Sequence, residues 1–322
     1  MSAGDSASSN PDPLGPFLDR QGVVVLDGGL ATELEARGCD LGDDLWSARL
    51  LLDDPGLIRR VHLAYLRAGA DCVTSASYQA TVEGFVGRGL GRGEAEALLG
   101  RAVELARQAR DDFWSDGGSR PGRLRPLVAA SIGPYGAYLA DGSEYTGDYD
   151  LDEDGLVAFH RRRFDLLAAS GADLLACETI PSRPEARALV RLLRRRPGVR
   201  AWVSFSCRDG RHLNDGSELT VAVADVAGLD EVVAVGVNCT APRFIDDSID
   251  EVRRASAKPV VVYPNSGEAY DAAGKRWREA ESAGDLAAAA VAWRRRGAAL
   301  IGGCCRTHPA DIRRIRERLL GG

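Results

Sequence analysis

Short apolar runs recur along the chain and give the first expectation for its fold. Each run is almost continuously apolar and is bounded by Gly, Pro, Asp or Ser. Such runs are typical of strands that are buried on both faces, as in a parallel sheet. We expect eight strands, at Val23–Leu26, Cys72–Ser75, Leu127–Ile132, Leu174–Cys177, Trp202–Ser206, Val232–Val237, Pro259–Tyr263 and Ala298–Ile301.

The segments between these runs have the spacing of amphipathic helices. Pro55–Ala68 is the clearest, because Asp54 suits an N-cap, Pro55 suits the first helical position and Gly69 follows as a stop signal. The fifth connection, Thr220–Gly228, is short and only weakly periodic. Six further helices are expected, at Gly93–Phe113, Glu153–Ala169, Arg183–Arg196, Arg243–Ala255, Leu286–Arg296 and Pro309–Leu320.

Strands that alternate with helices in this number predict an α/β fold, a single (β/α)₈ TIM barrel. The 322 residues allow one such barrel or two ordinary domains. A doubly wound sheet is the alternative, but it usually has a G-x-G-x-x-G loop after its first strand. Here DGGLAT (27–32) follows instead. We therefore expect the barrel over residues 17–322. Residues 1–16 are rich in Ser, Asp, Pro and Gly, and we expect them to form a flexible leader.

Composition narrows the partners and the compartment. The 41 basic and 47 acidic residues give a net charge of −6, which argues against a nucleic-acid partner. No run reaches the roughly 18 apolar residues of a membrane helix, and no signal-peptide pattern is present. We therefore expect a cytoplasmic protein with no membrane partner. In that reducing compartment its seven cysteines should be thiols, metal ligands or catalysts.

Chemically reactive residue types follow the apolar runs, at the end where a barrel assembles its active site. The first run leads to Asp27 and the fourth to Glu178. Other strand ends lead to Tyr78, Ser206, Asn238, Cys239, Asn265, Glu268, Cys304 and Cys305. These residues are therefore candidates for one shared site.

Cys239, Cys304 and Cys305 are the strongest candidates for a metal site. Three thiolates at one rim suit Zn²⁺, and a three-ligand site keeps one tetrahedral position open, as in catalytic zinc sites. Ordinary buried cysteines are the alternative. The position of all three at strand ends favours the metal site. The other four cysteines, Cys39, Cys72, Cys177 and Cys207, lack such company.

The charge of such a centre favours one kind of chemistry. Three thiolates around Zn²⁺ leave a net negative charge, which makes the centre a poor acid for ionising water. It can instead hold an incoming thiol as its thiolate. Alkylation of a thiol is therefore favoured over hydrolysis.

Several motifs extend these observations along most of the chain. They are LDGGLATELEARG (26–38), TSASYQATVEGF (74–85), ASIGPYGAYLADGSEYTGDY (130–149), CETIPSRPEA (177–186), SFSCRDGRHL (204–213), GVNCT (236–240), VYPNSGE (262–268) and IGGCCRTHP (301–309). With these motifs the sequence resembles the homocysteine S-methyltransferases, zinc-dependent (β/α)₈ barrels that methylate homocysteine to methionine. The resemblance runs from about Val23 to Leu320, and its fuller motif set is similar to the branch that uses S-methylmethionine or S-adenosylmethionine.

The resemblance implies a role for each matching residue. Cys239, Cys304 and Cys305 would be the zinc ligands. Asp27 and Glu178 would hold the homocysteine amino group, with the Gly28–Gly29 backbone beside the carboxylate. Without the resemblance, the alternatives are that Asp27 caps a helix and that Glu178 pairs with a neighbouring arginine. The remaining candidates for substrate contact or support are Tyr78, Ser206, Asn238, Asn265 and Glu268, with Tyr145 and Tyr263 as further aromatic faces for a sulfonium.

The resemblance also implies the reaction and its substrates. Homocysteine would bind to zinc as a thiolate and attack the methyl group of a small sulfonium donor. The barrel uses Val23–Leu320, so we expect no cobalamin or folate domain. Betaine is the alternative donor, but related betaine enzymes have a C-terminal extension, whereas this chain ends about one helix after Cys305. We therefore expect a sulfonium donor and a monomer or small homo-oligomer.

Three other functions fit less well. A Schiff-base aldolase needs a lysine at a strand end, but Lys258 precedes its run and Lys275 lies in a predicted loop. A thiol-transfer protein would favour a C-x-x-C spacing, which is absent. A non-catalytic, zinc-stabilised binding protein would have a closed four-ligand site, and no fourth thiol or imidazole is obvious.

Overall fold

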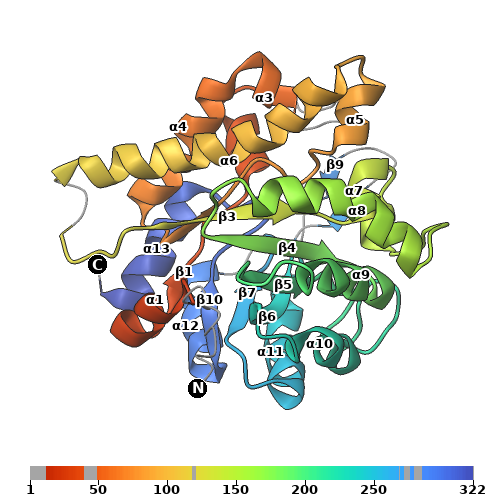
Figure 1. The fold of residues 1–322 in the computed structure, drawn as a ribbon. Coiled ribbons are helices and arrows are strands. Elements are labelled where there is room, and N and C mark those ends of the chain that lie inside the picture. Colours follow the sequence, from red (N-terminus) through yellow and green to blue (C-terminus); the bar gives the residue numbers. More distant parts are fainter. Residues whose placement is uncertain are drawn as a thin grey trace, which may run out of the picture.

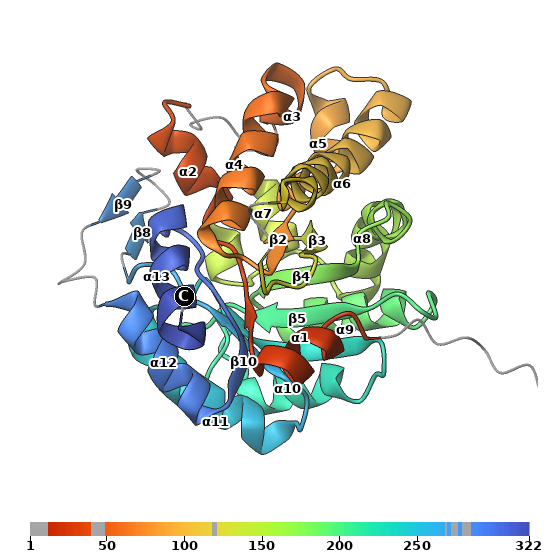
Figure 2. The same ribbon diagram turned by 90° about the vertical axis from the view of Figure 1, so that its left-hand side faces the viewer.

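The computed structural model describes residues 12–39, 49–117, 121–267, 269–271, 276–278 and 285–321. Eight strands form one parallel sheet in the order β1-β10-β7-β6-β5-β4-β3-β2. A parallel bridge between Leu26 and Cys72 joins its two edges. The arrows of β3 and β4 run the same way in Figure 1, and the outer helices surround the sheet in Figure 2. The expected (β/α)₈ barrel is confirmed.

The strands coincide with the apolar runs, with small differences at their ends. β4 is the main exception, because it continues three residues past Cys177, the end of its run. The strands are β1 (Val24–Val25), β2 (Cys72–Thr74), β3 (Leu127–Ile132), β4 (Leu174–Ile180), β5 (Ala201–Phe205), β6 (Val232–Asn238), β7 (Val260–Tyr263) and β10 (Ala298–Ile301). A separate antiparallel pair is formed by β8 (Ala269–Asp271) and β9 (Arg276–Arg278).

The main helices also lie where the sequence predicts them. In α4 (Pro55–Ala68) the Asp54 carboxylate accepts the Leu57 N–H at 3.0 Å, and Gly69 ends the helix in the left-handed region. The weakly periodic connection is a helix, α10. The other outer helices are α6 (Arg92–Ser115), α8 (Glu153–Ala168), α9 (Arg183–Leu193), α10 (Leu219–Ala227), α11 (Ile245–Ala255), α12 (Leu286–Arg296) and α13 (Pro309–Leu320).

Short helices occupy several connections that lack a helical period. They are α2 (Leu30–Ala36), α3 (Leu50–Asp53), α5 (Val82–Gly87), α7 (Tyr135–Leu139) and the 3₁₀ turns η3 (Ser143–Tyr145) and η4 (Pro242–Phe244). The expected start of the sixth helix at Arg243 falls in η4, and α11 begins at Ile245. Most of these segments follow a strand, so they build the rim at which the strands end.

The N-terminal helix α1 (Gly15–Gln21) closes the opposite end of the barrel. Leu14 is fully buried and Phe17 nearly so, and both pack with barrel-interior residues such as Trp202 and Leu300. The expected end of the leader at residue 16 therefore falls inside an ordered, buried segment, because these apolar side chains have a core to fill. Residues 1–11 of that leader lie outside the described part of the chain.

The interior of the barrel is separate from the core between the sheet and its helices. Side chains on one face of the strands fill the barrel, and those on the other face pack against the helices. Within the described ranges, no helix is both long and apolar enough to cross a membrane. The barrel is thus filled at the end where α1 lies, and its pocket opens where the strands end.

Candidate active site

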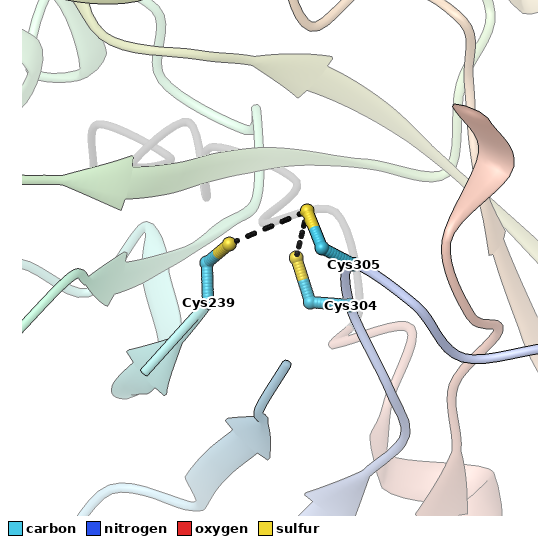
Figure 3. Close-up of side chains that lie close together, drawn as sticks. All are labelled: Cys239, Cys304 and Cys305. Carbon is cyan, nitrogen blue, oxygen red and sulfur yellow. Dashed lines mark hydrogen bonds between the residues drawn. The ribbon is translucent and has the colours of Figure 1, made fainter. Parts of the chain in front are cut away.

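Three thiols meet at the rim where the strands end (Figure 3). Cys239 directly follows β6, and Cys304 and Cys305 follow β10. The Sγ atoms of Cys239 and Cys305 are 3.6 Å apart, those of Cys304 and Cys305 are 4.0 Å apart, and all three lie within 4.8 Å of one another. The convergence expected from the strand ends is present in the structure.

The backbone around the thiols is held by close packing and by strain. A Cβ at Gly302 would lie 2.6 Å from the Leu26 Cβ, and one at Gly303 would lie 2.4 Å from the Thr307 Oγ1. Only glycine therefore lets the chain before Cys304 approach β1. Cys239 itself has a φ of 47°, in the left-handed region that side-chain-bearing residues rarely adopt.

Protonation of the three thiols is coupled. Hydrogen bonds from Cys304 and Cys305 lower the pKa of the Cys239 thiol well below its usual value. Contacts with Cys239 and Cys304 raise the pKa of the Cys305 thiol, and the contact with Cys239 raises the pKa of the Cys304 thiol. Without a metal ion, the cluster thus favours one thiolate, stabilised by the two neighbouring thiols. A divalent cation that prefers sulfur would allow all three to ionise, and the donor set fits such a metal.

Asp27 lies just after β1 and lines the pocket, and it does not cap a helix. It accepts the backbone N–H of Thr74 at 2.8 Å and the Thr74 hydroxyl at 3.1 Å. The N-cap of α2 is Gly29 and has no side-chain cap. Burial, followed by the nearby charge of Glu178, raises the pKa of Asp27 to about 8. Asp27 is thus a buried carboxyl group poised to ionise when a cation arrives.

Glu178 lies in β4 and shares the pocket with Asp27. Its carboxylate accepts hydrogen bonds from the Ser131 hydroxyl and from the Tyr263 hydroxyl, the latter at 3.0 Å. Burial raises the pKa of Glu178 to about 7. Its hydrogen-bond partners are thus hydroxyl groups rather than the arginine considered from the sequence.

A bulge at the end of β4 sets the position of Glu178. The pairing of β4 with β5 shifts register between Cys177 and Ile180, and Thr179 has a φ of 61°. A β-branched residue in this region is strained. The fully buried Asn238 holds it there, because its Oδ1 accepts the Thr179 N–H and its Nδ2 donates to the Thr179 Oγ1, both at 2.7 Å.

The contacts between Asn238 and Thr179 explain where several candidate residues lie. Asn238 is fully buried behind the residues that line the pocket. It connects the bulge beside Glu178 to Cys239, the next residue in the chain. Ser206 donates to the Thr179 carbonyl at 3.3 Å, and Asn265 donates to the Cys239 carbonyl at 3.4 Å. These contacts support the site residues, and a direct substrate contact for the three remains a prediction. Glu268 lies outside the described residues.

The pocket around these groups holds about 760 Å³ of empty space, part of it open to solvent. The candidates Asp27, Glu178, Tyr78 and the three thiols all line it. Gly28 and Gly29 line it as well, and the Gly29 N–H donates to the Thr307 carbonyl at 3.1 Å. The thiols and the carboxylates therefore border one continuous space that is open to solvent.

Glu144 and Thr74 also take part in the pocket, and the sequence reasoning did not single them out. Thr74 provides both hydrogen bonds to Asp27. Glu144 lies in η3 and lines the pocket, where burial raises its pKa to about 7. Both residues fall inside the motifs TSASYQATVEGF and ASIGPYGAYLADGSEYTGDY, and position within a motif was the only available signal.

Fold and site together define a (β/α)₈-barrel protein with a three-cysteine metal site at the strand ends. The family model for homocysteine S-methyltransferase matches residues 24–319. The chain belongs to the homocysteine S-methyltransferase family.

Individual relatives agree over almost the full length. A homocysteine S-methyltransferase from Bacillus subtilis is 51% identical over 94% of this chain and 96% of its own. One from Escherichia coli is also 51% identical, over 96% of this chain and 99% of its own. The metallated crystal form of the Escherichia coli homocysteine methyltransferase MmuM matches with a TM-score of 0.86 and 49% identity, covering 95% of this chain and all of that one.

Proposed function

We propose that this protein transfers a methyl group from a sulfonium donor, S-methylmethionine or S-adenosylmethionine, to homocysteine, and so makes methionine. The observation that carries the proposal is the placement of three converging thiols beside two buried carboxylates in one pocket. A thiol substrate with an ammonium group matches both halves of this arrangement. The family and its named relatives support the same activity.

The thiols of Cys239, Cys304 and Cys305 would hold Zn²⁺. Three sulfur ligands within reach of one point suit this metal and leave one position for a substrate thiol. When bound, zinc would supply the positive charge that lets a coordinated thiol lose its proton at neutral pH.

Asp27 and Glu178 would bind the homocysteine ammonium group. Burial disfavours their ionised forms and so raises both pKa values. A cation between them reverses that preference, since a nearby positive charge stabilises the carboxylates. Binding of the ammonium therefore orients the amino acid, with its thiol directed toward the cysteines.

The methyl transfer itself needs little from acid or base groups. The homocysteine thiol releases one proton to solvent, and its sulfur attacks the donor methyl carbon in line. The new S–C bond forms as the donor C–S⁺ bond breaks, and that electron pair stays on the leaving sulfur. The leaving group is a neutral thioether, so no general acid is required. Positioning by the pocket supplies the rest of the rate enhancement.

The test measures zinc content and methionine formation on the same protein. S-methylmethionine, S-adenosylmethionine and betaine are offered separately with homocysteine. We expect about one zinc per chain and turnover with at least one sulfonium donor. Full activity in metal-free protein would overturn the metal assignment. Turnover with betaine alone would overturn the donor assignment and leave the metal site standing.

A further inference from the structure

Glu144 is a third carboxylate in the pocket, and the proposed function gives it no role so far. It lies in η3, the 3₁₀ turn that follows α7, and it lines the same empty space as the three thiols. Its charge acts on the thiols of both Cys239 and Cys304, so it lies near the place where the methyl group would be transferred. Tyr145 and Tyr78 line the same space and favour its ionised form.

Glycines in the loop after β3 bring Glu144 to this position. A Cβ at Gly136 would lie 2.2 Å from the backbone nitrogen of Glu144, and one at Gly133 would lie 2.6 Å from the Tyr78 carbonyl oxygen. Real side chains do not tolerate such distances. Both glycines therefore let the loop pack against itself and against Tyr78, with Glu144 and Tyr145 directed into the pocket.

The acidic lining of the pocket indicates a second cationic ligand besides the homocysteine ammonium. Asp27, Glu144 and Glu178 line it together with three thiols, whereas no arginine, lysine or histidine occurs among the described lining residues. Asp27 and Glu178 are buried and Glu144 is half-buried. Carboxylates held away from water without a cation are costly, so such a pocket selects cationic ligands. Asp27 and Glu178 are assigned to the homocysteine ammonium, which leaves Glu144 for the other substrate.

We propose that Glu144 is the residue that binds the sulfonium centre of the methyl donor, with the rings of Tyr78 and Tyr145 beside it. This assignment rests on the proposed function. A carboxylate next to a sulfonium lowers its energy in the bound state, and aromatic rings favour the same cation. Glu144 therefore sets selectivity for charged donors over the neutral thioether that leaves.

The chemistry predicts how this contact divides between binding and rate. The sulfonium loses its positive charge as the methyl leaves, so the attraction to Glu144 weakens in the transition state. An interaction that is stronger in the bound donor than in the transition state lowers KM without raising kcat. Loss of the Glu144 charge should therefore raise the donor KM, and kcat should stay the same or rise.

The test compares Glu144→Gln with wild type as the zinc-loaded, full-length protein. Asp148→Asn is the matched control, because Asp148 is an exposed acid in the same loop and its loss changes net charge equally. We expect Glu144→Gln to raise the KM for S-methylmethionine about tenfold, which equals about 1.4 kcal/mol. Zinc content and the homocysteine KM should stay within about twofold, kcat should not fall, and Glu144→Asp should recover part of the donor affinity.

A second probe separates the sulfonium from the donor's ammonium group. Dimethylsulfoniopropionate has a sulfonium and a carboxylate but no ammonium, and its inhibition constant should rise in Glu144→Gln as the S-methylmethionine KM does. If only ammonium-bearing donors weaken, Glu144 binds the ammonium and the proposal is wrong. Loss of zinc in Glu144→Gln would make Glu144 a metal ligand instead, and a rise confined to the homocysteine KM would place it in the homocysteine site.

The outcome for Glu144 is distinguishable from the outcome for the proposed function. Wild-type protein that transfers no methyl group from any sulfonium defeats the proposed function. Wild-type protein that is active, beside a Glu144→Gln variant with an unchanged donor KM, defeats only the role of Glu144.

Discussion

Asp71 and Asp27 are both buried aspartates, and they lie at opposite ends of the barrel, one before β2 and one after β1. Asp71 accepts hydrogen bonds from Arg316 at 2.9 Å, Arg123 at 3.3 Å and Gln21 at 2.6 Å. Asp27 accepts only from Thr74 among the contacts described above, and its pKa is raised. One aspartate joins parts of the fold, and the other is left for a cation that the chain does not supply.

The backbone shows the same contrast between the two ends. Where helices lead into strands, the left-handed positions are glycines: Gly22, Gly69, Gly122, Gly171, Gly198 and Gly297. Within the described ranges, every non-glycine residue with positive φ follows or ends a strand instead: Ala140, Thr179, Cys239 and Arg306. Each such residue costs about 1–2 kcal/mol. The end where the strands begin is built for stability, and the other end accepts strain to position side chains.

Removal of one thiol should have the largest effect. In Cys239→Ser we expect zinc retention to be lost and methionine formation to fall by at least about 1000-fold, or roughly 4 kcal/mol, because a three-ligand site has no spare ligand. Atomic absorption and a methionine assay measure the two effects. Cys72→Ala is the control, since Cys72 is a buried cysteine at the start of β2. A Cys239→Ser protein that keeps both zinc and turnover would remove the proposed metal site.

Asp71→Asn should be the most damaging change at the end where the strands begin. It leaves Arg123 and Arg316 largely buried without their anion, so we expect a loss of about 3 kcal/mol in the free energy of unfolding. Urea unfolding measures this loss. The homocysteine and donor KM values of the folded fraction should stay unchanged. A variant that is as stable as wild type would show that the contrast between the two aspartates is not energetic.

Asp27→Asn should raise the free energy of unfolding, whereas Asp71→Asn should lower it. Between about pH 4 and pH 8 the folded, ligand-free protein keeps a proton on Asp27 that the unfolded chain has released. Wild-type stability therefore falls as the pH rises through this window, and Glu178 adds to the slope up to about pH 7. Asp27→Asn should reduce that slope and gain about 2 kcal/mol at pH 8, after allowance for relaxation around the buried charge.

The cost of this gain should appear in substrate binding. Without the Asp27 charge, the homocysteine KM should rise about 100-fold, which equals roughly 2.7 kcal/mol. The measurement is urea unfolding of metal-free protein at pH 5 and pH 8, beside steady-state kinetics of the zinc form. An unchanged pH slope in the variant would show that Asp27 ionises in the folded protein as freely as in water.

The sequence predicts the barrel well because its strands are continuous apolar runs, which need no distant partner to be recognised. It predicts the thiol cluster because the ends of parallel strands share one rim. The end of β4 was harder, since polar Glu178 and Thr179 resemble a loop, and the bulge depends on Asn238 from β6. Glu144 sits in a segment without periodicity, and its direction is decided by packing at Gly136. Such contacts between distant segments have no local pattern.

The smallest predicted effects test the backbone contrast directly, with two substitutions of the same two residue types. Ala140 has a φ of 55° at the end of α7, and Gly171 has a φ of 80° between α8 and β4. Ala140→Gly should raise the free energy of unfolding by up to about 1 kcal/mol, and Gly171→Ala should lower it by about as much. Because Ala140 precedes η3, its greater freedom should also raise the donor KM slightly, whereas Gly171→Ala should leave kinetics unchanged. If both substitutions changed the free energy of unfolding in the same direction, the strain at the strand ends would not lie in the backbone. Side-chain packing alone would then distinguish the two ends of the barrel.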